Sequence, residues 1–253
     1  MARIVCIASG KGGVGKTTVC SNLAAALAKL GKSVIAVDCN LTTSNLGLHL
    51  GVPLYPVTLQ DVLARNADIQ DAIYYHSGGF KVVPADMSLE KSHSSTADRL
   101  LDVFYSLAHN GGTDFILIDS AAGLGREART AIEASDEMIT VTNPEMPALI
   151  DALKLGKVAE ELNTNNLGII LNRVRGERHE VKQKEVEDFL GLSTIGIVNE
   201  DRAVARSISM KEPIVIHKPN SAASRQFIAI AAKLAGESYS PGLPLWHRLF
   251  NWL

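Results

Sequence analysis

The chain has 253 residues and a mass of 27.1 kDa, enough for one large domain or two small ones with a sizeable core. Its 46% hydrophobic and 21% charged residues exclude an intrinsically disordered chain and a protein with many membrane spans. Lys and Arg number 25 against 27 Asp and Glu, and the net charge of −2 predicts no overall attraction to nucleic acid.

The three cysteines, Cys6, Cys20 and Cys39, form no C-x-x-C pair and lie in or beside apolar runs. The sequence therefore predicts neither a disulfide framework nor a zinc site, and it favours a reducing cytosol. The apolar run of residues 4–8 is too short for the core of a signal peptide, and no stretch approaches the roughly 18 apolar residues that span a bilayer. We expect a cytoplasmic protein whose contact with a membrane is peripheral.

Short β-branched runs alternate with helical patterns along the chain. Most of these runs are apolar throughout, which is typical of strands buried on both faces of a parallel sheet. The predicted strands are residues 4–8, 34–37, 80–83, 115–118, 138–141 and 167–171, and the predicted helices are residues 16–30, 58–65, 96–109, 147–162, 180–190, 200–209 and 221–235. This order predicts an α/β fold with a doubly wound, mainly parallel sheet, whose ligands bind beyond the carboxyl ends of the strands.

A glycine-rich segment follows the first predicted strand directly and continues into a helix. It reads Gly10-Lys11-Gly12-Gly13-Val14-Gly15-Lys16-Thr17-Thr18, which satisfies the pattern G-x-x-x-x-G-K-[ST]. Backbone N–H groups of such a loop turn around phosphate oxygens, and the helix dipole favours the negative charge. We expect Lys16 to reach the β and γ phosphates, Thr17 to ligate Mg²⁺ and Thr18 to contact phosphate. The segment therefore predicts a P-loop that binds ATP with Mg²⁺.

Two carboxylates follow predicted strands on the same side of the sheet. Asp38 ends the second strand and Asp119 ends the fourth. Carboxylates at these positions face the phosphates and commonly hold Mg²⁺ through its waters, while the adjoining loops change order when the γ phosphate leaves. The predicted metal-binding set is therefore Thr17, Asp38 and Asp119.

The loop sequence K-G-G-V-G-K-T-T resembles the deviant phosphate loop of the MinD/ParA ATPase family. Residues 38–47 and 119–125 look like switch I and switch II of that family, and residues 141–145, 171–174 and 213–223 are also similar to it. The resemblance covers residues 2 to about 235 and the C-terminal tail. It implies a P-loop ATPase fold of the MinD/ParA type.

The resemblance also implies roles for single residues. In this family the early lysine, here Lys11, reaches across a nucleotide-sandwich homodimer to the ATP of the partner subunit, and Asn172 occupies the position whose amide reads adenine. The family usually has Ile-Pro-Glu-Asp where this chain has Val-Asn-Glu-Asp at residues 198–201, so Asn199 is a departure beside the expected base pocket. A protein partner, recruited by the ATPase or stimulating it, is implied without being identified.

Switch I departs from the family at its second carboxylate. The family normally has Asp-x-Asp, whose second Asp positions the water that attacks the γ phosphate, and this chain has Asn40 there. An amide bonds water but lacks the charge and basicity of a carboxylate, so we expect slow hydrolysis with ATP binding retained. Asn40 is either an engineered change that traps the ATP-bound state, which we favour at this point, or natural in a slow ATPase. The candidate catalytic residues are Lys11, Lys16, Asn40 and Asp119.

The composition changes after the body of the chain. Residues 236–243 form a helix-hostile spacer, and residues 244–253 form an amphipathic segment. At 100° per residue its apolar members fall on an arc of about 160°. The predicted membrane-contacting residues are Leu245, Trp246, Arg248, Leu249, Phe250, Trp252 and Leu253. Bulky rings with a basic residue are typical of a helix that binds anionic lipid at the headgroups. The alternative is a tail that packs on its own body or on a sister subunit.

These features predict a MinD-like ATPase in residues 1–235, joined by the spacer to a membrane-targeting helix. We expect it to dimerise with ATP, to bind the inner face of the cell membrane reversibly, and to position the division site or another structure. A ParA-type DNA-segregation ATPase and an ATP-binding scaffold without turnover are the alternatives. An iron–sulfur carrier needs paired cluster cysteines, which the sequence lacks, and no direct contact with nucleic acid is expected.

Overall fold

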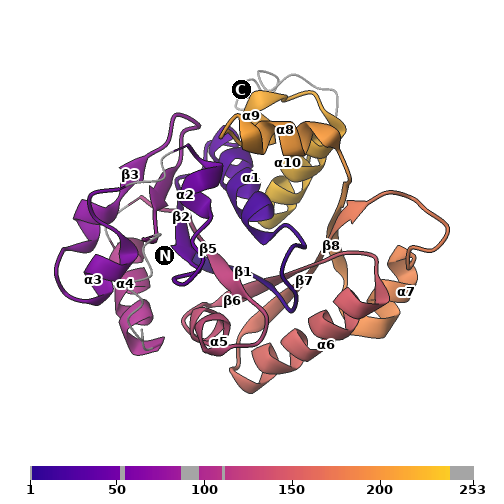
Figure 1. Cartoon of the computed structure of the whole chain (residues 1–253), viewed down its shortest axis with the longest axis horizontal. Helices are drawn as coiled ribbons and strands as arrows, with labels where there is room; N and C mark the ends of the chain where they lie inside the picture. Colours follow the sequence, from indigo (N-terminus) through magenta and orange to yellow (C-terminus); the bar gives the residue numbers. More distant parts are fainter. Residues whose placement is uncertain (1, 52–54, 87–96, 110–111, 240–253) are drawn as a thin grey trace, which may run out of the picture.

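A single sheet of eight strands runs through the molecule in the order β3-β4-β2-β5-β1-β6-β7-β8 (Figure 1). Its strands are β1 Arg3–Ser9, β2 Val34–Cys39, β3 Tyr74–Tyr75, β4 Lys81–Val83, β5 Phe115–Ala122, β6 Glu137–Thr142, β7 Asn165–Val174 and β8 Thr194–Asn199. All neighbours pair in parallel except β3 with β4. The computed structural model describes residues 2–51, 55–86, 97–109 and 112–239.

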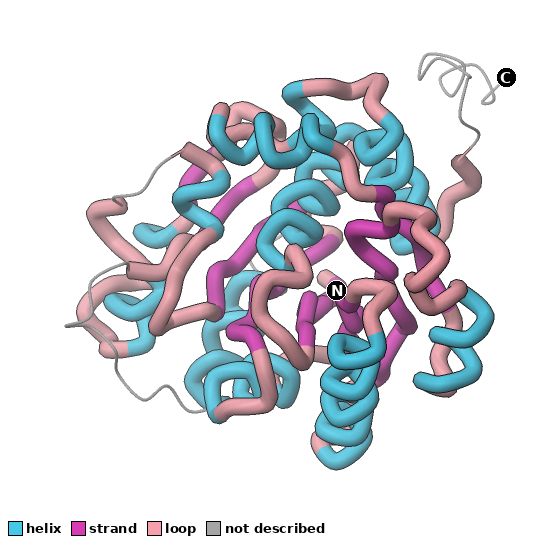
Figure 2. The backbone as a smooth tube through the Cα atoms, turned by 45° about the vertical axis from the view of Figure 1, so that its right-hand side comes forward, coloured by secondary structure: helices cyan, strands magenta, loops and turns pink. Residues whose placement is uncertain are grey.

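Helices cover both faces of the sheet (Figure 2). They are α1 Lys16–Lys29, α2 Leu46–His49, α3 Leu59–Leu63, α4 Ala97–His109, α5 Arg126–Glu133, α6 Met146–Glu161, α7 Gln183–Leu190, α8 Arg202–Ser209, α9 Ile214–His217 and α10 Ala222–Leu234, with a 3₁₀ turn η1 Ile69–Ala72. One apolar core lies between the sheet and helices α1, α9 and α10, and a second lies between the opposite face and α3 to α6. These two layers around the sheet confirm the predicted doubly wound α/β fold.

The central strands form where the sequence is apolar without alternation. Every residue of β2 is buried, because helices cover both of its faces. Helix α1 ends where predicted, and Gly31 follows it with φ +80°, a left-handed conformation that glycine adopts without strain. All six predicted strands are present in the sheet, and the helices predicted from sequence correspond to α1, α3, α4, α6, α7, α8 and α10.

Strands β3 and β8 and helices α2, α5 and α9 were not predicted. Strand β8 contains Gly196, which weakens a strand pattern. The structure supplies a packing reason for this glycine, since a Cβ there would lie 2.2 Å from Cγ1 of Ile230 in α10. Helix α5 begins directly after the glycine-containing segment of residues 119–125, which reads as a loop. Its short helical pattern was therefore not recognised in the sequence.

The body of the chain continues a few residues beyond α10. Glu237 forms a 3.0 Å ion pair with Lys32, and its backbone N–H bonds the carbonyl of Ala232, so the start of the predicted spacer lies against the body. The predicted amphipathic segment, residues 244–253, lies outside the described residues. None of the helices in the described part of the chain has the length and apolarity needed to cross a membrane.

Candidate functional site

The glycine-rich loop joins β1 to α1 at the carboxyl edge of the sheet. Gly15 precedes the first turn of α1 with φ +96°, so the loop needs glycine there to aim backbone N–H groups at one point. Helix α6 packs closely on the other end of the loop, because a Cβ on Gly10 would lie 2.2 Å from the backbone oxygen of Asp151. Both glycines are therefore fixed by geometry.

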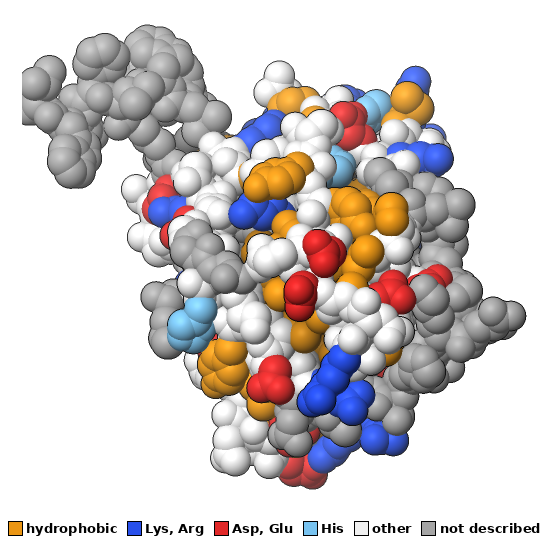
Figure 3. Space-filling model, turned by 90° about the vertical axis from the view of Figure 1, so that its left-hand side faces the viewer, with side chains coloured by type: hydrophobic (Ala, Val, Ile, Leu, Met, Phe, Trp, Pro, Cys, Tyr) orange, Lys and Arg blue, Asp and Glu red, His pale blue; other side chains and the backbone are white. Residues whose placement is uncertain are grey.

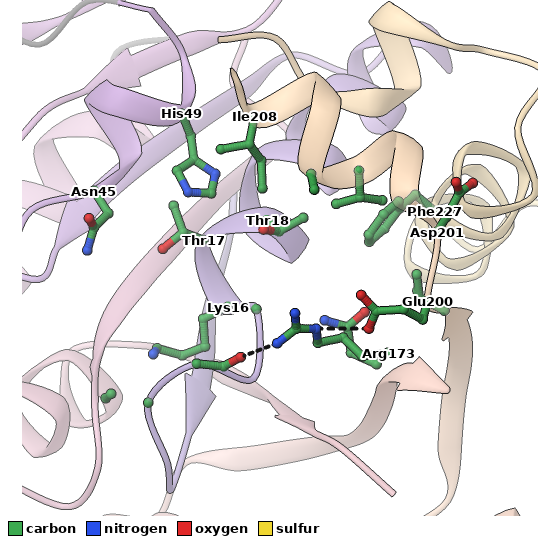
Figure 4. A pocket seen from close by; sticks show the side chains of 18 of the residues that line it. Lys16, Thr17, Thr18, Asn45, His49, Arg173, Glu200, Asp201, Ile208 and Phe227 are labelled. Atoms are coloured by element: carbon green, nitrogen blue, oxygen red, sulfur yellow. Dashed lines mark hydrogen bonds and ion pairs between the residues drawn. The ribbon is translucent and has the colours of Figure 1, made fainter. Parts of the chain in front are cut away.

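A cavity of about 420 Å³ opens beside this loop (Figure 4). Its polar end is formed by Gly12, Gly13, Gly15, Lys16, Thr17, Thr18, Asn40, Thr43 and Asn45, and its other side by Asn172, Arg173, Val198, Asn199, Glu200, Asp201, Val204, Ala205, Ile208 and Phe227, with His49 and Ala122 also lining it. The glycine-rich loop at one end, and the apolar side chains of Val198, Val204, Ile208 and Phe227 among polar groups at the other, suit a ligand with phosphates at one end and an aromatic base at the other.

Lys16 is buried at the polar end of the cavity. Only 8% of its surface is exposed, and burial lowers the pKa of its ammonium, an effect that Asp119 and Asp38 partly oppose. A buried ammonium without a hydrogen-bonded partner in the described part of the chain is costly, so an anionic ligand at this point would stabilise it.

Asp119, at the end of β5, is buried and has no hydrogen-bond partner on either carboxylate oxygen among the described residues. Burial raises the pKa of this carboxyl group to about 7, and the charge of Asp38 adds to the rise, while Thr17 and Lys16 lower the pKa in part. An orphaned carboxylate beside a threonine hydroxyl fits a divalent cation that arrives with phosphate.

Asp38 lies beside Asp119 but differs from it in its bonding. The two residues are paired in the register of β2 and β5. The Asp38 carboxylate accepts hydrogen bonds from the Ser44 hydroxyl at 2.8 Å, the Leu46 N–H at 3.1 Å and the Asn40 N–H at 3.0 Å. Burial nevertheless raises the pKa of Asp38. Asp38 thus organises the loop that follows β2, and any role of it at a cation runs through water.

Asn40 uses both ends of its amide within its own loop. Its Nδ2 donates to the carbonyl of Thr43 at 2.6 Å, and its Oδ1 accepts from the Thr43 hydroxyl at 2.9 Å and N–H at 3.3 Å. The sequence placed this side chain toward an attacking water, and in the structure it borders the cavity while closing a turn.

Asn172, at the end of β7, is almost fully buried against the glycine-rich loop. Its Nδ2 donates to the backbone oxygen of Val14 at 2.7 Å, and a Cβ on Gly15 would lie 2.4 Å from the same nitrogen. The side chain therefore lines the cavity where the resemblance implied, and it also supports the loop. No described residue bonds its Oδ1, which leaves an acceptor for an amino group.

Lys11 lies at the surface of the loop, apart from the cavity. Its backbone oxygen accepts from the Ser9 hydroxyl at 2.8 Å, and its ammonium has no ion pair within the ranges that the structure describes. Thr18 lines the cavity, and its carbonyl accepts from the Asn22 amide at 2.8 Å.

The sequence analysis missed Arg173 and His49, which also line the cavity. Arg173 has φ +57°, and its guanidinium bonds Glu200 at 3.0 Å and the carbonyl of Gly13 at 3.1 Å, so it bridges the mouth of the site (Figure 4). Burial lowers the pKa of His49, which favours its neutral form. The position of Arg173 directly after Asn172 was an available signal, whereas His49 lies in α2, which the sequence did not predict.

The loop, the orphaned carboxylate and the sheet order together define a P-loop nucleotide-binding domain of the doubly wound class. The model of the CobQ/CobB/MinD/ParA nucleotide binding domain matches residues 5–214, and the chain belongs to this family. An uncharacterized ATP-binding protein of Methanocaldococcus jannaschii is 42% identical over 96% of this chain and 91% of its own length.

Solved structures agree with this assignment. The cell division ATPase MinD of Pyrococcus furiosus is 38% identical and superimposes with a TM-score of 0.88, covering 93% of this chain and 99% of that one. The septum site-determining protein MinD of Pyrococcus horikoshii, solved with Mg-ADP, is also 38% identical, with a TM-score of 0.87 over 92% of this chain and 96% of its own.

Proposed function

We propose that this protein is a MinD-like ATPase that dimerises with ATP and cycles on and off the inner face of the cell membrane. The observation that carries the proposal is the buried carboxylate of Asp119 beside Lys16 and Thr17, two residues that line a cavity of about 420 Å³. Lys16 and Asp119 only partly compensate each other in the protein alone, and with Thr17 they complement a nucleotide with its cation.

Lys16 would neutralise the β and γ phosphates, and the N–H groups of residues 10–18 would surround them. Thr17 and Asp119, with Asp38 through water, would hold Mg²⁺, which neutralises charge on the phosphates when it is bound. The Oδ1 of Asn172 would accept from the amino group of adenine, beside the apolar surface of Ile208 and Phe227.

Dimerisation with ATP is supported by the exposed ammonium of Lys11, which has no acidic partner in the described chain. Beside the phosphates of ATP bound to a second subunit, this ammonium would acquire the negatively charged partner that its own subunit does not provide.

Slow hydrolysis is supported by the amide at position 40, which has no carboxylate charge.

Membrane contact is supported by the amphipathic sequence of residues 244–253. It is also supported by a cluster of basic residues on the surface, which the net charge of the whole chain did not indicate. Helix α8, helix α9 and the start of α10 pack together. Exposed basic residues on these helices and on the turns between them have no ion pair among described residues. They are Arg202, Arg206, Lys211, Lys218 and Arg225. Glu200, Asp201 and Glu212 lie among these residues. On the face shown in Figure 3, acidic, basic and hydrophobic side chains are instead interspersed. A surface on which basic side chains predominate attracts anionic headgroups.

The same basic surface also favours a second candidate, a ParA-type ATPase that binds DNA. Co-sedimentation separates the two. The protein is mixed with vesicles of anionic or neutral lipid, or with duplex DNA, in ATP, in ADP and without nucleotide. The proposal expects binding to anionic vesicles that is strongest in ATP, whereas ATP-dependent binding to DNA alone would replace it with the ParA-type function.

A further inference from the structure

The loop after β2 offers no free polar group at position 40. As described above, both ends of the Asn40 amide bond Thr43, so the amide closes a turn over residues 40–43. A water that attacks the γ phosphate needs an acceptor close by, and a carboxylate is the strongest such acceptor among side chains. Asp38 bonds the N–H of Asn40, but both of its oxygens already accept hydrogen bonds from its own loop. The candidate is therefore a carboxylate from another element that contacts this turn.

Glu127 is that carboxylate. It lies in the first turn of α5, directly after residues 119–125, and its Oε1 accepts a hydrogen bond from the hydroxyl of Thr42. Thr42 is flanked by Thr43, which lines the cavity. The second oxygen of Glu127 has no hydrogen bond to any residue that the structure describes, so it remains available to a water molecule.

The surrounding backbone holds Glu127 on the phosphate side of the sheet. Strands β2 and β5 pair in register up to Cys39 and Ser120, so the two loops that follow them lie side by side. The N–H of Gly123 bonds the carbonyl of Ser9 at 3.0 Å, which ties the loop before α5 to the residue that precedes the glycine-rich loop. After burial and nearer acidic groups, the charge of Glu127 also raises the pKa of the Cys39 thiol.

We propose that Glu127 orients and deprotonates the attacking water, in place of the carboxylate that the family's pattern has at position 40. This inference rests on the proposed ATPase function. The water oxygen forms a bond to the γ phosphorus, the bond from that phosphorus to the bridging oxygen of ADP breaks, and the bridging oxygen keeps the electron pair. The proton of the water passes to Glu127, and Thr42 is the positioning residue that holds the carboxylate.

Two substitutions and their combination test this role. Glu127→Gln should lower kcat by about tenfold or more without changing KM for ATP, because the amide is not a base. Asn40→Asp should raise kcat by at least about tenfold, because it restores a carboxylate at the usual position. In the Asn40→Asp background, Glu127→Gln should change kcat by less than about twofold, since the restored carboxylate no longer needs Glu127.

A structural role for Glu127 gives a different pattern. A residue that only holds α5 in place would lower kcat by the same factor in both backgrounds, and that result would overturn the inference. Glu133→Gln, an exposed carboxylate on the same helix, is the matched control and should leave turnover unchanged.

A second readout follows the lifetime of the dimer in place of the release of phosphate. Dimers formed in ATP and then diluted into nucleotide-free buffer should persist longer in Glu127→Gln than in the unmodified chain, as measured by light scattering. Equal lifetimes would contradict the role of Glu127. A chain that binds ATP but never hydrolyses it would contradict the proposed ATPase activity itself, whereas turnover that Glu127→Gln leaves intact would contradict only this inference.

Discussion

The side-chain amide of Asn172 donates a 2.7 Å hydrogen bond to the backbone oxygen of Val14, 158 residues earlier in the chain. The contact joins the end of β7 to the glycine-rich loop between β1 and α1. It leaves room for no side chain on Gly15, whose Cβ would lie 2.4 Å from the same amide nitrogen. One side chain therefore sets the shape of the glycine-rich loop while lining the cavity beside it.

Substituting Asn172 should weaken nucleotide binding through the loop as well as through the base. Asn172→Asp keeps the shape of the side chain, but a carboxylate cannot donate to Val14 and repels its carbonyl. We expect ATP affinity to fall about tenfold or more, the effect of about 1–3 kcal/mol from an unpaired buried group. Titration with a fluorescent ATP analogue measures it. Asn165→Asp, at the exposed start of β7, is the control, and equal losses in the two variants would contradict this role.

The pKa of Asp119 makes the stability of the nucleotide-free protein depend on pH. The folded chain holds a proton on this carboxyl up to about pH 7, whereas the unfolded chain releases it near pH 4. The folded state thus binds more protons in this window, so the free energy of unfolding should decrease as pH rises from about 4 to about 7. Asp38, whose pKa is also raised, acts in the same direction.

Urea denaturation at pH 5 and at pH 8 tests this dependence. Asp119→Asn removes the titrating group, so the loss of stability between the two pH values should be smaller than in the unmodified chain. Asp188→Asn, which changes an exposed carboxylate on α7, should leave the difference as it was. The same pH response in all three proteins would show that Asp119 is not the group responsible.

Substitution of the two lysines of the loop should have different effects on ATP binding and on dimerisation. Lys16→Ala removes the buried charge at the phosphates and should abolish ATP binding. Lys11→Ala should retain ATP binding while losing the dimer, because Lys11 is exposed and does not line the cavity of its own subunit. Light scattering in ATP and in ADP gives the mass of each variant. A Lys11→Ala protein that dimerises as well as the parent would exclude a contact across subunits.

Local patterns predicted the sheet and the loop, since both depend on neighbouring residues in the sequence. The run of apolar residues in β2 and the spacing of Gly10 to Thr17 needed no tertiary information. Strand β8 was not predicted because the glycine at position 196 weakens the strand pattern. The reason for that glycine is its close contact with Ile230 of α10, which only the structure shows. A pattern of single residues does not contain such a contact.

The site was predictable as a set of residue types but not as a set of contacts. The sequence predicted Lys16, Thr17 and Asp119 at one edge of the sheet. In the structure Lys16 and Thr17 line the cavity, and Asp119 is buried beside them. It did not indicate that Asn40 bonds Thr43 or that Glu127 lies next to the loop after β2, because side-chain hydrogen bonds between distant loops leave no periodic signal. The basic residues of α8 to α10 were hidden because acidic residues elsewhere balance the total charge.

Membrane binding should depend on the apolar arc of residues 244–253 and not on the charge of this segment alone. Removing residues 244–253 should eliminate binding to anionic vesicles and leave ATP binding intact, because the nucleotide cavity is formed by residues 12–227. Phe250→Glu should have nearly the same effect, because it places a charge within the apolar arc. Arg248→Glu should weaken binding to anionic lipid by about 1 kcal/mol per lost basic contact, and more at low salt.

Asn251→Glu provides the matched comparison for Phe250→Glu, since it adds the same charge on the polar side of the segment. It should reduce vesicle binding only slightly, and its effect should disappear at high salt, whereas the loss in Phe250→Glu should persist because it arises from lost apolar contact. Sedimentation in ATP at low and high salt distinguishes the two variants.

If the chain without residues 244–253 still sedimented with vesicles, the basic surface of α8 to α10 would be the membrane contact. Charge reversal at Arg202 and Arg206 should then release the protein from the vesicles.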